Sequence, residues 1–209
     1  MLLNYHYWYF SGALNQDTCD KIIREANRLK DRKAITGHNG KSSNKKFKDL
    51  TKKQKENLKK IRNSNIVWLN NEWIYELLHP YVKTANVNAG WNFQWERSEA
   101  IQFTKYKLNQ FYDWHQDPFL VPAEEGLFKG LIRKLSTIVT LTDSSEYEGG
   151  ELEFDLRNTT KGKNIITCKE IMPRGSIVVF PSHIWHRVKP VKKGTRKSLV
   201  MWSNGKPFM

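Results

Sequence analysis

Cysteine and long apolar runs are both scarce in this sequence, and each shortage excludes a class of protein. The two cysteines, Cys19 and Cys168, lie far apart and form no C-x-x-C pair, so neither a disulfide framework nor a zinc knuckle is expected. No stretch of about 18 apolar residues is present, as a membrane-spanning helix would need. The segment Met1–Phe10 also lacks a basic leader and a small-residue cleavage site. These features predict a cytoplasmic protein, in a reducing compartment, with no membrane span and no export signal.

Internal repeats and low-complexity tracts are lacking as well, which indicates one folded domain. The 209 residues can bury a single core but leave little chain for a second one. Apolar residues make up 39% and aromatic residues 12% of the chain, with eight Trp, which is more than a disordered chain would carry. We therefore predict a single domain over residues 1–209.

Acidic residues are outnumbered, because 35 Lys and Arg against 21 Asp and Glu give a net charge of +14. The segment Lys41–Arg62 is strongly basic, with ten Lys and Arg against Asp49 and Glu56. It could attract an acidic protein or a nucleic acid over a long range. The alternative is an ordinary solvated helix flank, preceded by a polar loop over Gly37–Lys48. No aromatic stacking ladder is interleaved with these charges, as single-strand binding would favour.

Helical patterns dominate the first half of the chain. Asn15 or Asp17 can cap a first amphipathic helix, and a second, lightly packed helix is predicted to start at Thr51. The third and strongest pattern is the apolar stripe of Trp73–Ala85, in which a kink is expected at Pro80. These helices are expected to support one face of a sheet.

From about Glu99 the hydrophobic period changes to two, which predicts strands. The candidate strands are Ala100–Tyr106, Leu135–Leu141, Glu151–Phe154, Ile165–Cys168, Ser176–Phe180 and Ser198–Trp202. The turns between them are predicted at Lys107–Asn109, Tyr147–Gly150, Met172–Gly175 and Lys192–Thr195. Helices followed by strands, with no βαβ rhythm, favour an α+β protein built on an antiparallel sandwich or barrel.

The pair His115-x-Asp117 is the first feature that points to chemistry. If this segment is extended, side chains two residues apart lie on the same side, so the imidazole and the carboxylate could hold one metal ion. A distant second histidine would complete a facial set of two imidazoles and one carboxylate, which suits Fe(II) and leaves coordination positions open. Alone the pair is a weak signal, because it occurs by chance in many chains and a lone histidine is more often a hydrogen-bonded core residue.

The surroundings of His186 strengthen this interpretation. His186 follows the predicted strand Ser176–Phe180 and a turn at Pro181, which would place it at a strand end. Arg196 opens another strand, where its guanidinium could hold a carboxylate in bidentate fashion. His183, within the turn, is expected to be solvated or hydrogen-bonded rather than metal-bound.

Taken in order, these segments resemble the Fe(II)- and 2-oxoglutarate-dependent dioxygenases, in particular the prolyl 4-hydroxylase-like branch. The resemblance covers roughly residues 99–202. The segments that carry it are Tyr106, His115-Gln116-Asp117, Arg133-Lys134-Leu135-Ser136, Tyr147-Glu148-Gly149-Gly150-Glu151-Leu152, Phe180-Pro181-Ser182, His186-Arg187-Val188, Pro190-Val191 and Gly194-Thr195-Arg196. Each segment is a weak signal alone, but together and in this order they are specific.

The resemblance implies roles for individual residues. It implies that His115, Asp117 and His186 are the ligands of Fe(II). It also implies that Arg196 binds the distal carboxylate of 2-oxoglutarate and that Tyr106 hydrogen-bonds this cosubstrate. The walls of the cosubstrate pocket are expected at Thr140, Val188 and Trp202. For Tyr106 and Trp202 the alternative is an aromatic side chain that fills the core.

A fold and a reaction are also implied by the resemblance. The fold would be α+β, with a double-stranded β-helix core of the jelly-roll, cupin-like type over residues 99–203, supported by mainly helical residues 1–98. The reaction would be hydroxylation of an unactivated C–H bond with Fe(II) and 2-oxoglutarate, which releases succinate and CO2. Ascorbate stays open as a further cofactor.

The resemblance favours a prolyl residue of a protein or peptide as the target. Arg196 resembles the oxygen-sensing and bacterial-type enzymes, whereas collagen-type enzymes typically use Lys at that position. An acidic partner would suit the basic charge. The loop Pro118–Gly130, which follows Asp117, could close over a substrate or be an ordinary linker.

Two alternative functions stay open. One is a nucleic-acid-directed oxidative dealkylase or hydroxylase, although related dealkylases usually carry a second Arg six residues after the cosubstrate Arg, where this chain has Trp202. The other is a catalytically silent basic binding module. The sequence makes no prediction of oligomeric state.

Overall fold

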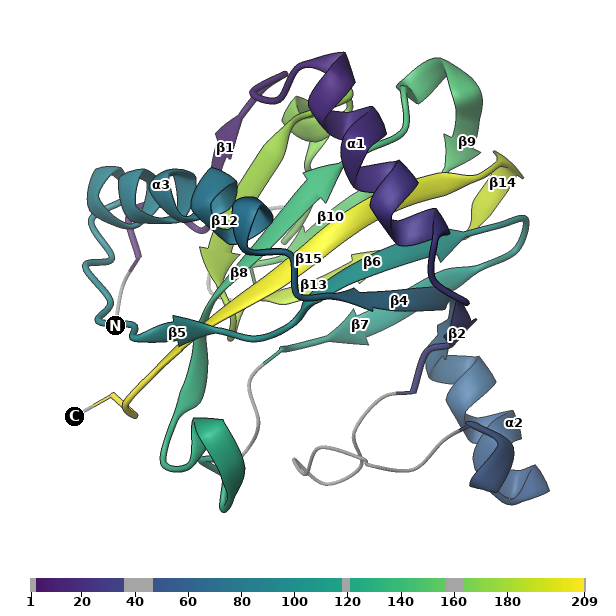
Figure 1. Cartoon of the computed structure of the whole chain (residues 1–209), viewed down its shortest axis with the longest axis horizontal. Coiled ribbons are helices and arrows are strands. Elements are labelled where there is room, and N and C mark those ends of the chain that lie inside the picture. Colours follow the sequence, from purple (N-terminus) through teal and green to yellow (C-terminus); the bar gives the residue numbers. More distant parts are fainter. Residues whose placement is uncertain (1–2, 36–46, 118–120, 157–163, 209) are drawn as a thin grey trace.

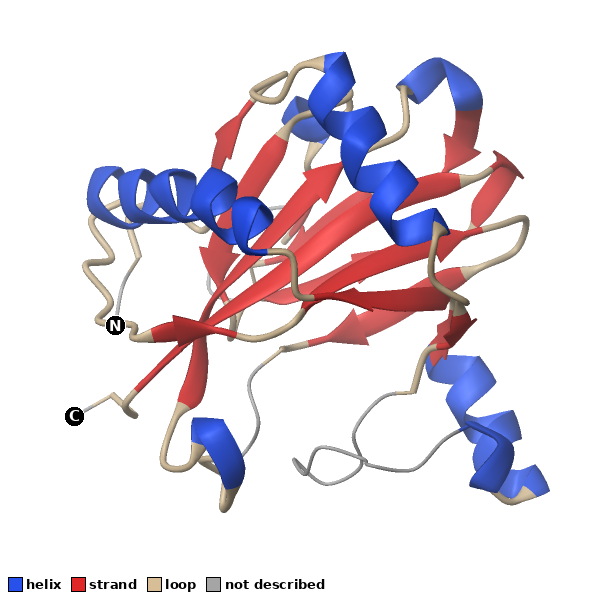
Figure 2. Cartoon of the chain, viewed as in Figure 1, coloured by secondary structure: helices blue, strands red, loops and turns tan. Residues whose placement is uncertain are grey.

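Two antiparallel β-sheets pack face to face, and the helices of residues 16–27 and 72–88 cover the outer face of the larger sheet (Figures 1 and 2). This computed structural model describes residues 3–35, 47–117, 121–156 and 164–208. The helices are α1 (Gln16–Asn27), α2 (Lys52–Ile61) and α3 (Glu72–Asn88), with short 3-10 turns η1 (Phe47–Asp49), η2 (Gly126–Phe128), η3 (Ser144–Glu146) and η4 (Lys169–Ile171). The arrangement is the jelly roll that the sequence predicts.

The larger sheet has the strand order β1-β12-β8-β15-β6-β4-β2, and β5 pairs with β15. Its strands are β1 (Trp8–Phe10), β2 (Arg32–Lys33), β4 (Asn65–Leu69), β5 (Arg97–Ser98), β6 (Ile101–Tyr106), β8 (Ile132–Thr140), β12 (Ile177–Pro181) and β15 (Arg196–Gly205). The smaller sheet has the order β11-β10-β13-β7-β3. Its strands are β3 (Arg62–Asn63), β7 (Phe111–His115), β10 (Leu152–Asp155), β11 (Ile165–Thr167) and β13 (Trp185–Val188). A separate pair is formed by β9 (Tyr147–Gly149) and β14 (Val191–Gly194).

Two apolar clusters hold these layers together. One lies between the helices and the larger sheet, where Ile22, Phe103 and Leu199 are fully buried. The other lies between the two sheets around Phe154 and Phe180. Each such side chain contributes roughly 1.5–3 kcal/mol through removal of its apolar surface from water. The inner cluster supports the strands that carry the site described below.

The three predicted helices are confirmed, and side-chain caps begin two of them, α1 and α2. The side chain of Asn15 accepts a hydrogen bond from the Thr18 backbone at 2.9 Å and begins α1. Thr51 and Gln54 form a reciprocal capping box at the start of α2. α3 continues through Pro80, which lies on its exposed side, so the proline does not end the helix.

The structure adds to one part of the prediction from sequence and contradicts another. The support region predicted over residues 1–98 also carries strands, because β1, β2 and β4 extend the larger sheet and β3 extends the smaller one. These strands have two to five residues, which is too short for a period of two to be recognised. The segments Tyr147–Gly150 and Lys192–Thr195, predicted as turns, instead supply the paired strands β9 and β14. Their glycines, Gly149 and Gly194, allow close approach, since a Cβ on either would collide with backbone of the facing segment.

Part of the predicted basic segment lies outside the residues that the structure describes. The residues of the predicted polar loop before Phe47 lie outside the described residues, with Lys41, Lys45 and Lys46 of the basic segment. The rest of that segment forms η1, α2 and β3. Cys19 and Cys168 are free thiols, and both are buried. Across the described ranges, no helix is both long and apolar enough to cross a membrane.

Candidate functional site

Three polar side chains meet at the end of two neighbouring strands of the smaller sheet. His115 is the last residue of β7, Asp117 follows two residues later, and His186 on β13 stands opposite His115 in the register. The Nε2 atom of His115 lies 3.7 Å from Oδ1 of Asp117, and Nε2 of His186 lies 3.5 Å from Oδ2. One nitrogen or oxygen atom from each residue lies within 4.8 Å of the others. The structure thus brings the three predicted ligands together.

Backbone carbonyls fix the orientation of both imidazoles. Nδ1 of His115 lies 2.7 Å from the Asp113 carbonyl oxygen, and Nδ1 of His186 lies 2.9 Å from that of Ile184. A carbonyl only accepts, so each Nδ1 carries the proton and each Nε2, on the side of Asp117, has a lone pair available to a metal ion. Burial, and then the neighbouring His186, lower the pKa of His115 well below its ordinary value. The imidazole of His115 is therefore neutral at pH 7, which is the form that binds metal ions.

The Asp117 carboxylate is held from behind by a serine. The hydroxyl of Ser136, on β8, donates to Oδ2 at 2.6 Å, and the Ser182 hydroxyl lies 2.9 Å from that of Ser136. Burial alone would raise the pKa of Asp117, but the neighbouring His186, His115 and Arg133 and this hydrogen bond lower it to about 2. The carboxylate is therefore ionised at neutral pH.

The chemistry of these donors fits Fe(II). Two neutral imidazole nitrogens and one carboxylate oxygen on one side of a site form the facial set that non-haem Fe(II) oxygenases use. His115, Asp117 and His186 all line a cavity of about 1320 Å³, so the remaining coordination positions would open toward that cavity. Zinc in a structural site would instead require a closed tetrahedral set.

The same cavity contains most of the residues predicted for the cosubstrate pocket. Tyr106, Val188, Arg196 and Trp202 all line it. Tyr106 and Arg196 stand opposite each other in the pairing of β6 with β15, and the Arg196 guanidinium carbon lies 5.7 Å from the Tyr106 ring centroid. Thr140 is the exception, because it lines a separate cavity of about 260 Å³. Arg196 lines both cavities, so Thr140 lies beside the predicted cosubstrate anchor, and its place in the wall of the cosubstrate pocket stays a prediction.

Arg196 is a buried cation that lacks a carboxylate partner in the described part of the chain. Its side chain is 2% exposed, and the hydrogen bond it makes there is from Nη1 to the Ser198 hydroxyl at 3.3 Å. A Cβ on Gly150 would approach the Cδ of Arg196 to 3.0 Å, so this glycine leaves room for the arginine stem. A buried guanidinium of this kind favours an anionic ligand, because burial of an unpaired charge is costly.

Four further residues at the site were not assigned a role from the sequence. The Tyr112 ring stacks on the His115 imidazole with centroids 3.4 Å apart, and the Arg62 guanidinium lies 4.4 Å from the Tyr112 ring centroid. Arg133 forms two 2.6 Å hydrogen bonds to the carboxylate of Glu99, and its guanidinium lies 3.9 Å above the Trp202 ring. Arg133 belongs to a segment that carries the resemblance, whereas Arg62 lies in the N-terminal part, where no motif pointed to it.

His183 and the loop Pro118–Gly130 both lie next to the triad in the sequence. The backbone carbonyl of His183 accepts a hydrogen bond from the Gln116 side chain, and His183 is not part of the metal-ligand group, as predicted. Of the loop Pro118–Gly130, the first three residues lie outside the described ranges. Its remainder carries η2 and lines the cavity with Val121, Leu127 and their neighbours.

Comparison with known proteins defines the class. Residues 101–204, which include all three members of the triad, match the model of the 2OG-Fe(II) oxygenase superfamily. The chain therefore belongs to this superfamily, whose cofactors are Fe(II) and 2-oxoglutarate.

Within the superfamily, the chain is similar to hydroxylases. A PKHD-type hydroxylase of Prochlorococcus marinus is 31% identical over 153 residues, which is 72% of this chain and 59% of that protein. The chain thus spans less than two thirds of this relative.

Two solved structures share the fold. A viral collagen prolyl hydroxylase of Paramecium bursaria Chlorella virus-1 in complex with 2OG has a TM-score of 0.64 at 19% identity, over 97% of each chain. A prolyl hydroxylase of Trichoplax adhaerens, in complex with a hypoxia-inducible factor peptide fragment, has a TM-score of 0.66 at 14% identity, over 96% of this chain and 84% of that one.

Proposed function

We propose that the protein is an Fe(II)- and 2-oxoglutarate-dependent hydroxylase that acts on a prolyl residue of a protein or peptide. The observation that carries the proposal is the facial group of His115, Asp117 and His186 at the wall of the large cavity. The names of the similar proteins support it, since all three are hydroxylases and two are prolyl hydroxylases. The balanced reaction takes one C–H bond, O2 and 2-oxoglutarate, and gives one alcohol, succinate and CO2.

Different residues of the chain would bind the metal ion and the cosubstrate. His115, Asp117 and His186 would hold the metal ion, and Fe(II) together with 2-oxoglutarate supplies the oxygen-activating chemistry when bound. The guanidinium of Arg196 would pair with the distal carboxylate of the cosubstrate. The Tyr106 phenol, opposite Arg196, would donate to the same carboxylate, because burial raises the pKa of this phenol and keeps it protonated.

The surroundings of the triad limit motion and water access. The Ser136 hydroxyl holds the Asp117 carboxylate, and the stacked Tyr112 ring holds the His115 imidazole. Trp202, only 5% exposed beneath the Arg133 guanidinium, would form a rigid wall of the cavity. Such preorganisation places the substrate C–H bond near the open positions and saves the entropy of ordering these groups during the reaction.

Anaerobic titration with Fe(II) and 2-oxoglutarate tests the metal and cosubstrate sites. A metal-to-ligand charge-transfer absorption band is expected in the wild type and should vanish in His115→Ala. A band retained by that variant would reassign the ligands.

A peptide library tests the substrate. Incubation with Fe(II), 2-oxoglutarate and O2 should add the mass of one oxygen to proline-containing peptides and release an equal amount of succinate. The reaction is run with and without ascorbate, and an alkylated oligonucleotide serves as the competing substrate. Dealkylation of the oligonucleotide with no peptide oxidation would contradict the proposal, and a protein that forms no succinate with any substrate would be a silent binding module.

A further inference from the structure

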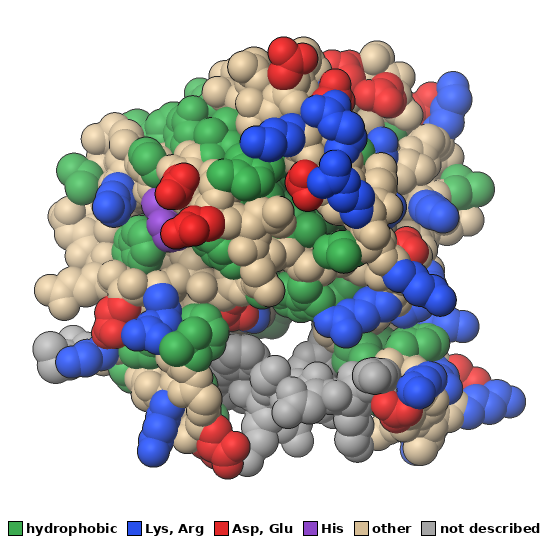
Figure 3. Space-filling model, viewed as in Figure 1, with side chains coloured by type: hydrophobic (Ala, Val, Ile, Leu, Met, Phe, Trp, Pro, Cys, Tyr) green, Lys and Arg blue, Asp and Glu red, His purple; other side chains and the backbone are tan. Residues whose placement is uncertain are grey.

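Three lysines from elements far apart in sequence lie around Asn63, at one edge of the larger sheet. The Lys33 ammonium donates to the Asn63 side-chain oxygen at 3.2 Å, and Gln110, in the turn that carries Lys107, approaches the same oxygen at 3.4 Å. Lys33 is on the edge strand β2, Lys59 is in α2, and Lys107 is in the turn between β6 and β7. Lys33 pairs with Asn65 and Asn65 pairs with Lys105, so a polar row crosses β2, β4 and β6. Figure 3 shows Lys and Arg side chains gathered over this edge and over α2. We call Lys33, Lys59 and Lys107 the lysine cluster.

The lysine cluster contains three like charges, none of them in an ion pair with a described carboxylate. The pKa of Lys33 is lowered from its ordinary value, first by burial and then by the nearby ammonium groups of Lys107 and Lys59, while the carboxylate of Asp31 acts in the opposite direction. The Asp31 carboxylate also accepts a hydrogen bond from Asn65 at 3.0 Å. Among the residues that the structure describes, no carboxylate lies within ion-pair distance of any of the three lysines. The mutual repulsion raises the free energy of the unliganded protein, and an anion bound there would offset it.

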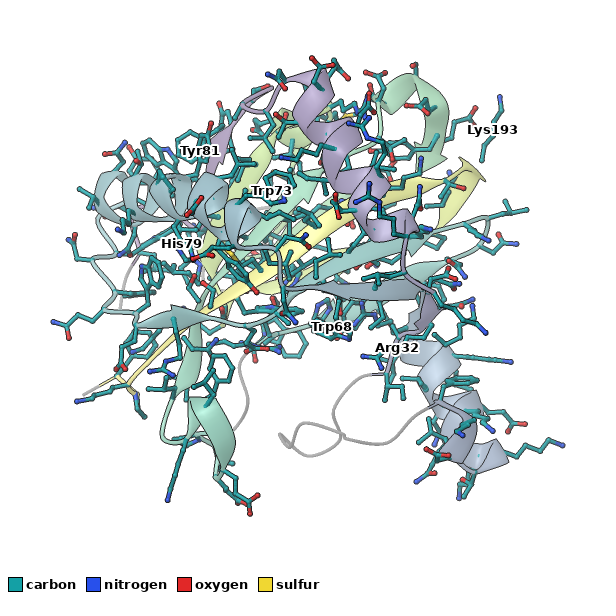
Figure 4. The ribbon with its side chains drawn as sticks, viewed as in Figure 1. Arg32, Trp68, Trp73, His79, Tyr81 and Lys193 are labelled. Atoms are coloured by element: carbon teal, nitrogen blue, oxygen red, sulfur yellow. The ribbon has the colours of Figure 1, made fainter. Side chains whose placement is uncertain are left out.

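The lysine cluster continues into the mouth of the large cavity. Arg32, the neighbour of Lys33 in β2, and Lys48 in η1 are both exposed, and both line the cavity. Figure 4 places Arg32 beside α2 and Trp68, another lining residue, on the adjacent strand β4. The segment before η2 contributes Glu124 and Glu125 to the lining. Positive charge at the mouth is therefore concentrated at the β2 and α2 side.

We infer that the lysine cluster, with Arg32 and Lys48, is a docking surface for an acidic stretch of the polypeptide substrate. The inference rests on the proposed function, because it places this stretch next to the residue that enters the cavity. Lysine ammonium groups on flexible stems suit flexible carboxylates, which need no fixed bidentate geometry. Several converging charges also raise the association rate of an oppositely charged chain.

A single-stranded nucleic acid would meet the same charges but would also require free aromatic faces. The aromatic rings near the metal-ligand group already have partners. Tyr112 is in contact with His115 and Arg62, and Trp202 is covered by Arg133. At η1, the Phe47 ring lies 5.7 Å from the Lys55 ammonium. These contacts favour an acidic polypeptide over a nucleic acid.

Fluorescence anisotropy on the full chain tests the inference. The probes are a labelled peptide with a proline beside a run of glutamates, the same peptide with glutamines, and an oligothymidylate. The test variant is Lys33→Gln, Lys59→Gln and Lys107→Gln combined. The matched control is Lys83→Gln, Lys169→Gln and Lys192→Gln, which removes the same charge from exposed lysines on α3, η4 and β14.

We expect the wild type to bind the glutamate peptide more tightly than the glutamine peptide. The affinity for the glutamate peptide should fall roughly tenfold in the cluster variant and about twofold or less in the control variant. The preference should weaken as salt is raised. Equal losses in both variants, or equal affinity for both peptides, would overturn the docking surface. Tighter binding of the oligothymidylate, lost in the same variant, would assign the surface to nucleic acid instead.

The binding assay is independent of turnover, so the two hypotheses can fail separately. If the glutamate peptide binds through the cluster but no peptide is hydroxylated, the proposed function is wrong and the docking surface stands. If peptides are hydroxylated equally well whatever their charge, with no loss in the cluster variant, the docking surface is wrong and the proposed function stands.

Discussion

The imidazole of His115 lies flat on the phenol ring of Tyr112, with centroids 3.4 Å apart and planes 12° from parallel. Both residues belong to β7, and the backbone carbonyl of Asp113 holds the other side of the imidazole through Nδ1. The ring is therefore fixed by one stacking contact and one hydrogen bond. This arrangement presents Nε2 to the metal position without further ordering.

Replacement of Tyr112 should weaken Fe(II) binding only when the new side chain cannot stack on His115. We expect Tyr112→Leu to reduce Fe(II) affinity roughly 2- to 10-fold, the range of an aromatic pair, and Tyr112→Phe to change it little. Anaerobic Fe(II) titration, followed by the charge-transfer band, measures both. Equal affinity in the leucine and phenylalanine variants would show that the stack does not orient His115.

Ser136 should contribute more to Fe(II) affinity than Ser182, although the two hydroxyls are in contact. Ser136→Ala removes the hydrogen bond to the Asp117 carboxylate, and loss of such an orienting partner typically costs roughly 10- to 100-fold in metal affinity. Ser182→Ala removes only the contact to the Ser136 hydroxyl and should cost less. The comparison requires Fe(II) titration of both variants. A larger effect of Ser182→Ala would contradict the assigned order.

Arg196 should determine the cosubstrate requirement rather than the iron requirement. Arg196→Ala removes the buried cation and should raise the 2-oxoglutarate concentration needed for half-maximal charge-transfer absorption by roughly 100-fold, about the loss of a strong charge-assisted pair. Arg196→Lys keeps the charge without the planar guanidinium, so its 2-oxoglutarate requirement should lie between those of the wild type and Arg196→Ala. An unchanged 2-oxoglutarate titration in Arg196→Ala would remove this residue from the cosubstrate site.

Gly175 should limit stability through a close backbone approach. It has a φ of +81°, its carbonyl accepts a hydrogen bond from Leu14 at 3.0 Å, and a Cβ there would collide with the Leu14 carbonyl. Gly175→Ala should cost about 1–3 kcal/mol in free energy of unfolding, the range for backbone strain. Gly12→Ala is the matched control, because Gly12 also has a positive φ of +58° but no atom within 4 Å of the added Cβ. Chemical denaturation should show a smaller loss in free energy of unfolding for Gly12→Ala. Equal losses in the two variants would contradict a role for the contact between Gly175 and Leu14.

Strand alternation predicted an antiparallel sandwich or barrel, and the resemblance carried by the ordered motifs implied the jelly roll and the ligand triad. The strands of residues 101–106 and 177–181 bury most of their side chains, so their apolar pattern is strong in the sequence. β7 and β13, which position the triad, were not predicted as strands, because their mixed sequences FYDWH and WHRV show no clean alternation. The His115-x-Asp117 pair was found from its spacing instead, and the resemblance implied His186 as the third ligand.

The chain's local patterns determined its helix caps, its buried strands and the His115-x-Asp117 pair, because each depends on spacing over a few residues. His186 was assigned from the order of the motifs along the chain. Tertiary structure decided which distant groups meet. It stacked Tyr112 on His115, brought Arg62 from the N-terminal part to the cavity, placed Thr140 in a second cavity that Arg196 also lines, and brought Lys33, Lys59 and Lys107 to one edge. These contacts depend on the pairing order of strands and on the packing of two sheets, which no local pattern encodes.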